Sequence, residues 1–164
     1  MARADVRPPG GQSLVQAAEK RKGNTMDVRV ALVADAANIS REGKLNVLGV
    51  FDRISASAFP AVHGAMALIV QFECGPAEWE TTKKVEVKLL DEDAHLIFGL
   101  ASDLDVPRGE TGRPVQIANV INLNGVRFEK PGQYRFDVLV NGETKAQVPI
   151  ALFAAKPATQ ANEP

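Results

Sequence analysis

Hydrophobic and polar residues alternate along much of the chain, most clearly in its last third. In residues 133–140 the apolar side chains share one parity, with Leu139 as the exception. A period of two is typical of a strand that is buried on one face. Asn141-Gly142 follows, and this pair is common in two-residue hairpin turns because both residues tolerate a positive φ. The pattern resumes with apolar residues at Ala146, Val148, Ile150 and Leu152. We therefore expect a β-hairpin.

Two features qualify this hairpin. Pro149 has no N–H, so it predicts that the second strand is an edge strand or has a broken ladder at that point. Pro131-Gly132-Gln133-Tyr134 directly precedes the first strand. The motif is similar to the tyrosine corner of immunoglobulin-like sandwiches, in which the phenol hydroxyl ties the corner to the strand. Tyr134 is therefore expected to be a structural corner residue.

Strand patterns recur through the chain, with turn signals about every ten residues. In residues 82–89 three apolar residues alternate with three charged ones, so a one-residue slip would bury the charges. Further strands are predicted at 28–35, 45–54, 65–74, 95–100, 115–123 and, as a short addition, 126–128. We expect 28–54 to form a hairpin, Asn124-Gly125 to form a turn, and 55–64 and 103–114 to be loops.

The body of the chain has no convincing helical pattern. The predicted fold class is therefore all-β, an antiparallel immunoglobulin-like β-sandwich of about eight strands. We expect one domain at 27–154, with flexible tails at 1–26 and 155–164 because these segments are polar or interrupted by proline. Met26 directly precedes the first predicted strand, which leaves open whether translation starts at Met1 or Met26.

Composition narrows the classes of function. The chain has 164 residues, a net charge of -1 and no cluster of basic residues interleaved with aromatic ones, which argues against nucleic acid as the main partner. It lacks a secretory signal pattern and any run of roughly 18 apolar residues, so we expect no membrane contact and a cytoplasmic location. The single cysteine, Cys74, excludes an internal disulfide framework.

The sequence contains few residues that suggest catalysis. The histidines are His63 and His95, no Gly-x-Ser-x-Gly motif occurs, and Cys74 has no catalytic signature around it. A structural zinc site uses four ligands, whereas the chain has three His and Cys residues in total. The glycines of 108–113 precede no predicted helix that would bind phosphate. We expect a protein that is not an enzyme and has no cofactor.

Carboxylates in two predicted turns are the remaining candidates for a metal. Calcium takes several oxygen ligands, and acidic residues cluster at 91–93 and 103–110. The candidates are Asp91, Glu92, Asp93, Asp103, Asp105 and Glu110. Their spacing matches no defined calcium loop, so solvated turn residues are the favoured interpretation.

Two apolar features suggest contact surfaces. Phe59 and Val62 lie in a predicted loop, where they either close the end of the sandwich or face a partner. The strand at 65–72 has apolar residues of both parities, although a two-layer sandwich covers only one face of each strand. The second face must then meet a loop, a tail or another subunit. The candidate interaction surface is Phe59, Val62, Leu68 and Val70.

Several motifs resemble a family of small bacterial proteins known only as a domain of unknown function. They are Ala34-Asp35-Ala36-Ala37-Asn38, the run 43–52, Phe59-Pro60, the run 89–93, the run 122–125 and Pro131-Gly132-Gln133-Tyr134. The resemblance covers 27–152. It implies one autonomous domain and brings no activity, cofactor or catalytic residue.

The polar residues of these motifs allow two interpretations. Asp35, Asn38, Asn46 and Asp52 either lock the end of a hairpin through hydrogen bonds or form one polar site at one end of the sandwich.

The leading hypothesis is a non-enzymatic module that acts through protein contacts, either with itself or in a larger bacterial complex. The alternative is a small-ligand or metal-binding sandwich that uses Asp35, Asn38, Asp52 and Asp91.

Overall fold

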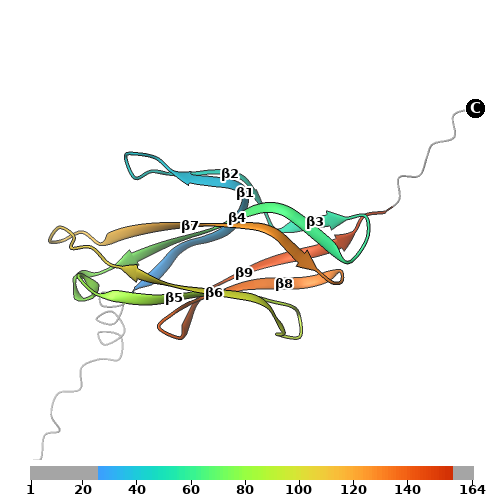
Figure 1. Cartoon of the computed structure of the whole chain (residues 1–164). Coiled ribbons are helices and arrows are strands. Elements are labelled where there is room, and N and C mark those ends of the chain that lie inside the picture. Colours follow the sequence, from blue (N-terminus) through green and yellow to red (C-terminus); the bar gives the residue numbers. More distant parts are fainter. Residues whose placement is uncertain (1–25, 157–164) are drawn as a thin grey trace, which may run out of the picture.

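The computed structural model describes residues 26–156, which form nine strands and one short 3-10 helix. The elements are β1 (Asp27–Ile39), β2 (Leu45–Phe51), β3 (Arg53–Ala56), β4 (Ala61–Cys74), η1 (Pro76–Glu78), β5 (Thr82–Leu90), β6 (Leu96–Asp105), β7 (Val115–Phe128), β8 (Gly132–Val140) and β9 (Glu143–Ala154). One sheet has the order β2-β1-β4-β7 and the other β3-β9-β8-β5-β6. Figure 1 shows them as two stacked layers.

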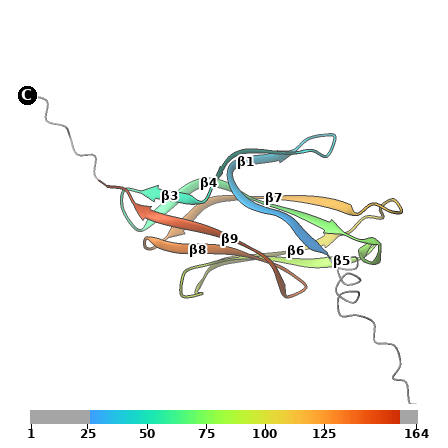
Figure 2. The ribbon, with the colours of Figure 1, turned by 180° about the vertical axis from the view of Figure 1, so that it is seen from behind.

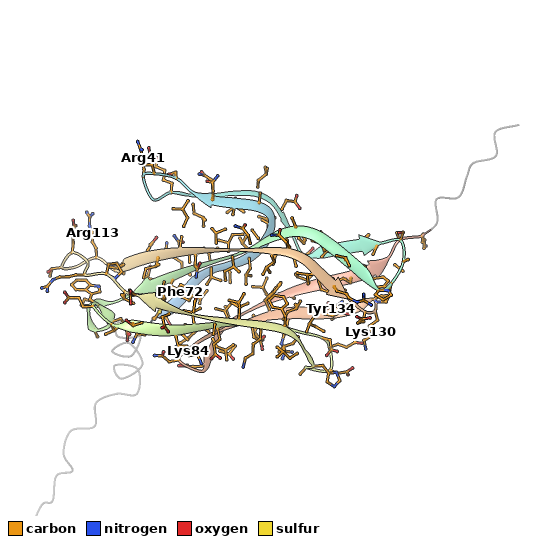
Figure 3. The ribbon with its side chains drawn as sticks, in the orientation of Figure 1. Arg41, Phe72, Lys84, Arg113, Lys130 and Tyr134 are labelled. Atoms are coloured by element: carbon orange, nitrogen blue, oxygen red, sulfur yellow. The ribbon has the colours of Figure 1, made fainter. Side chains whose placement is uncertain are left out.

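All strand pairs are antiparallel except β3 with β9, which is parallel. The apolar core lies between the layers and includes Phe72 of β4 and Phe136 of β8, both fully buried. Figure 3 shows Phe72 between the layers. The predicted fold class, an immunoglobulin-like antiparallel sandwich, is confirmed.

The predicted alternation of β5 sets the register with β8. Val85, Val87 and Leu89 are buried and lie opposite Val140, Val138 and Phe136. The intervening charged residues of β5 are exposed or half-buried. Burial of one parity alone explains why this pairing is well specified.

The predicted hairpin around Asn141-Gly142 is confirmed. β8 pairs with β9, and the turn residues have φ values of 48° and 82°. β9 is not an edge strand throughout, because β3 pairs with it from Ala151 to Ala154. Pro149 lies just before that segment, opposite Arg135 of β8, at a point where no described strand pairs with the other side of β9. A missing N–H is tolerated there.

The predicted strand 45–54 is wrong as a single element. β2 pairs with β1 in one sheet, whereas β3 pairs with β9 in the other. The chain changes sheet at Asp52, whose carbonyl oxygen accepts a 2.8 Å hydrogen bond from the Ala151 amide. The predicted hairpin is therefore formed by β1 and β2 alone.

Two predicted boundaries are also wrong. β4 begins at Ala61, inside the loop predicted at 55–64, and β6 continues to Asp105, inside the loop predicted at 103–114. Asn124-Gly125 is not a turn, because β7 runs through it with an unbroken register against β4. Gly125 has a φ of +65°, which glycine adopts without steric cost.

The two-sided strand at 65–72 is covered by the chain itself. Leu68 and Val70 are 0% and 1% exposed and belong to the main core, so their assignment to an interaction surface is wrong. On the opposite face Ala67 and Ile69 form a second cluster with Ala34. Ala37 and Leu45 of the β1–β2 hairpin pack on that cluster. The hairpin is thus a flap over the outer face of its own sheet.

The predicted tails fall almost wholly outside the described residues. Met26, which was assigned to the N-terminal tail, is 3% exposed and packs in the main core. Ala155 donates a backbone hydrogen bond to Ala56, at 2.8 Å. Met26 and Ala155, one residue on either side of the predicted domain 27–154, thus make contacts with it.

Candidate functional site

The polar motif residues of the β1–β2 hairpin form separate contacts. Asn38 and Asn46 are cross-strand partners, and the Asn46 Nδ2 donates a 2.8 Å hydrogen bond to the Asn38 Oδ1. Asp35 lies against Gly49, where a Cβ would collide with the Asp35 carboxylate. Gly49 also has a φ of +69°, so both the contact and the backbone require glycine here.

Asp52 stands apart from this pair of contacts. Its side chain is 74% exposed, and its carboxylate lies 3.4 Å from the Nε of Arg53. Surface ion pairs of this kind contribute little to stability. Asp35, Asn38, Asn46 and Asp52 therefore do not converge on one polar site. The Asn38–Asn46 contact fits the hairpin-lock interpretation.

Asp91 has a structural environment in the turn between β5 and β6. One carboxylate oxygen accepts backbone hydrogen bonds from Asp93 and His95 at 2.9 and 2.8 Å, and the other lies 3.2 Å from the His95 Nδ1. Desolvation opposes ionisation, but the hydrogen bonds from His95 and Asp93 outweigh it and lower the pKa of Asp91 from its ordinary value of 3.8. The ionised Asp91 carboxylate thus stabilises the conformation of the turn.

Asp91, Asp93 and His95 each place a ligand atom within 4.8 Å of the others. The Asp91 carboxylate already accepts hydrogen bonds within the turn, and the Asp93 carboxylate lies 3.6 Å from the Lys130 ammonium group. This turn is also remote from the hairpin, because Lys130 and the hairpin-tip residue Arg41 lie at opposite ends of the molecule (Figure 3). The structure does not bring Asp91 together with Asp35 and Asn38.

The remaining carboxylate candidates lie on or after β6. Asp103 and Asp105 are exposed strand residues, and the Asp105 Oδ1 accepts a 2.6 Å hydrogen bond from the Thr82 hydroxyl. Glu110 is exposed in the following loop, where its carbonyl accepts a backbone hydrogen bond from Arg113.

The residues considered for nucleophilic chemistry are far apart. His63 and Cys74 lie near the two ends of β4, which at about 3.3 Å per residue separates them by roughly 36 Å. Cys74 is fully buried, and desolvation, followed by the nearby Glu78 carboxylate, raises the pKa of its thiol to about 11. A buried thiol of that pKa is a poor nucleophile.

The β1–β2 hairpin carries a concentration of exposed apolar residues. On β2, Leu48 is 71% exposed, Val50 62% and Val47 36%, and Ile39 at the end of β1 is 46% exposed. Within residues 26–156, β2 is an edge strand that pairs with β1 alone. The hairpin lies on the outside of the two layers in both views (Figures 1 and 2).

β2 differs from the other edge strands. Proteins protect exposed edges with charges, prolines or short strands. Among the four edge strands that the structure describes, β3 has Arg53, β6 has Asp103 and Asp105, and β7 has Arg127. The seven residues of β2 include no charge and no proline. We refer to the free side of β2 with Leu48 and Val50 as the β2 edge.

Sequence reasoning placed the exposed surface elsewhere. Val62 is 63% exposed, as expected, but Phe59 is half-buried against the main core. The signal for the β2 edge was present, because Leu45 to Phe51 is apolar on both parities. A pattern alone does not tell which two-sided strand is covered by its own chain.

Comparison with known proteins identifies the family. A model described as "Family of unknown function (DUF6941)" matches residues 29–153. The chain belongs to this family. The resemblance inferred from the motifs is thereby confirmed, and no curated protein matches the DUF6941 chain.

Solved structures show distant similarity. The Pseudomonas fluorescens alkylpurine DNA glycosylase AlkC, bound to abasic-site DNA, matches at 16% identity and a TM-score of 0.46, over 82% of this chain and 32% of AlkC. A beta-glucuronidase from glycoside hydrolase family 2 matches at 9% identity and a TM-score of 0.37, over 58% of this chain and 11% of the beta-glucuronidase chain. An immunoglobulin-like protein from Pseudomonas aeruginosa matches at 12% identity and a TM-score of 0.38, over 79% of this chain and 98% of that protein's chain. The chain thus spans about a third or less of the first two proteins.

Within residues 26–156 no helix has the length and apolar character to cross a membrane.

Proposed function

We propose that this DUF6941 domain is a non-enzymatic interaction module, working in a bacterial cytoplasmic complex or a homo-oligomer. Its contact surface is the β2 edge. The observation that supports this proposal is an uncharged, proline-free edge strand with Leu48 and Val50 mostly exposed.

An edge strand favours one kind of partner. No strand of the described part of the chain lies opposite its outward N–H and C=O groups, and an extended segment that adds to the sheet would satisfy them. Leu48 and Val50 would supply apolar area beside the new strand, since they share one parity of β2. Main-chain hydrogen bonds would give affinity, and the side chains would select the partner.

The sheet behind β2 is suited to this role. Leu45 and Ala37 hold the hairpin on the cluster of Ala67 and Ile69, so the edge is supported from below. The hydrogen bond between Asn46 and Asn38 links the two strands near the hairpin tip. A supported edge loses less conformational entropy on binding than a mobile segment.

The test is affinity purification of the tagged full chain from its native host, followed by native mass measurement by light scattering. We expect the wild type to elute as a stoichiometric assembly, with itself or with a second protein, and Leu48→Lys to elute as one chain. Leu96→Lys is the matched control, because Leu96 is 59% exposed on another edge strand. A wild type at the mass of one chain, or a loss in both variants, would contradict the proposal.

A further inference from the structure

We propose that the occupant of the β2 edge is the β2 edge of a second copy, paired antiparallel about a twofold axis through Leu48. This inference rests on the proposed function and names the partner. It is supported by the charges that flank β2, because they select one register of self-pairing.

Two residues that face each other in an antiparallel pair project from the same face of the sheet, and side chains alternate between the faces along each strand. The twofold axis between two copies of one strand must therefore lie where a residue faces its own copy. Leu48 is the central residue of β2. With the axis there, Leu48 faces Leu48, and Asn46 faces Val50 of the second copy. Extended one residue beyond each end of β2, the same register sets Lys44 opposite Asp52 of the second copy, at the point where the chain turns toward its other sheet. The pairing occurs twice by symmetry and is attractive both times.

Neighbouring registers lack this complementarity. An axis at Val47 places Asp52 opposite Glu42, which brings two like charges together. An axis at Gly49 places Asp52 opposite Asn46 and Lys44 opposite Ile54, which pairs no charges. Because β2 has no internal charge, its two flanking residues decide the register.

Both charges are available for such a contact. Lys44 is exposed, and its described hydrogen bonds use its own main chain: its N–H donates to the Ser40 hydroxyl, and its carbonyl oxygen accepts from the Ser40 N–H. The Asp52 side chain is 74% exposed, and its described ion pair is the 3.4 Å contact with the neighbouring Arg53. Pairing would also cover Leu48 and Val50, the most exposed apolar side chains of β2. The result would be one continuous sheet across two copies.

The experiment is sedimentation equilibrium of the purified full chain, from micromolar to millimolar concentration. We expect a dimer for the wild type and a dissociation constant about tenfold weaker for Lys44→Asp and for Asp52→Lys, because each variant sets two like-charge pairs in the interface. A mixture of the two variants should form a heterodimer of near wild-type affinity, since both of its cross-strand pairs are attractive. The double variant should recover in the same way.

Controls separate charge, folding and surface effects. Arg113→Asp changes the net charge as Lys44→Asp does, at an exposed loop position, and should leave the dimer unchanged. Unchanged melting curves would show that the variants fold. Leu48→Lys should abolish the dimer, because it places two lysines on the axis.

Three outcomes would overturn the inference. The register would be refuted if Leu48→Lys abolished the dimer but the charge variants left its dissociation constant unchanged. It would also be refuted if the mixture of the two charge variants did not restore the affinity. Either result would leave the proposed function standing. A chain that stays monomeric at millimolar concentration would refute the proposal that the partner is a second copy. In that case, a host protein that binds the wild type but not Leu48→Lys would still support the proposed function. A dimer insensitive to Leu48→Lys would contradict both.

Discussion

Tyr134 joins the corner before β8 to the core. Its hydroxyl donates a 2.8 Å hydrogen bond to the Lys130 carbonyl oxygen, and its ring packs edge-on against Phe128 at a centroid distance of 5.0 Å. Tyr134→Phe removes the hydrogen bond and keeps the ring. We expect the free energy of unfolding to fall by about 1 kcal/mol, measured by urea denaturation. Tyr134→Ala should cost about 3–5 kcal/mol. Equal stability of Tyr134→Phe and the wild type would contradict this role.

Asp91 makes stability depend on pH. Its pKa is lowered in the folded state, so the ionised carboxylate stabilises the fold above its unfolded pKa, and this stabilisation is lost as the pH falls through the folded pKa. We expect Asp91→Asn to melt below the wild type at pH 7, with the difference shrinking as the pH falls below the ordinary value of 3.8. Melting curves between neutral and acidic pH check this.

The matched control for Asp91 is the exposed Asp93 in the same turn. Asp93 contributes a backbone N–H to the turn, which Asp93→Asn preserves, and its carboxylate contacts Lys130 at 3.6 Å. Asp93→Asn should melt close to the wild type across the same pH range, because exposed ion pairs contribute little. An equal deficit in both variants would assign the effect to general charge instead of the Asp91 hydrogen bonds.

Residues with a local role were predictable from sequence. Asn141-Gly142 and the motif around Tyr134 act within a few positions, so their spacing alone indicates a turn and a corner. Leu68 and Ile69 were not distinguishable in this way, since both are apolar and adjacent. Whether each faces the core, a flap or a partner depends on β1 and β2, which end at Ile39 and Phe51, well before these residues in the chain.

The β1–β2 hairpin is expected to open independently of the sandwich. Its outer part packs on a small cluster that is separate from the main core, with Leu45 as the half-buried contact from β2, whereas Phe51 at the base of β2 packs on the main core. Leu45→Ala should increase amide hydrogen exchange across 36–48 in dilute protein and change global stability little, because local opening follows local packing. The control is Leu104→Ala on β6, which packs on the main core. Faster hairpin exchange in that control, or none in Leu45→Ala, would contradict an independent hairpin.

Elements were predicted well in existence and poorly in their limits. Asp52 ends β2 because the Ala151 amide binds its carbonyl oxygen and draws the chain to the other sheet, a contact between residues far apart in sequence. Asn124-Gly125 permits a turn but does not impose one, and β7 stays paired with β4 on both sides of it. The candidate site was missed for the same reason. An uncovered β2 is recognised only after the sheet order is known.

At the scale of the whole molecule, the sandwich has one main core shared by both sheets. Phe72 comes from the four-stranded sheet and Phe136 from the five-stranded sheet, and both are fully buried in the same cluster. A shared core couples the sheets, since neither can keep its apolar face buried after the other unfolds. Unfolding of the body should therefore be one cooperative transition.

This coupling gives the last prediction. Phe72→Ala and Phe136→Ala should each lower the free energy of unfolding by about 3–5 kcal/mol, although they lie in different sheets. In both variants far-UV circular dichroism, which reports all strands, and the fluorescence of Trp79, which packs on the main core, should give the same urea midpoint. If Phe72→Ala separated the two midpoints while Phe136→Ala kept them together, the sheets would unfold as separate units. The single core would then not be what holds the sandwich together.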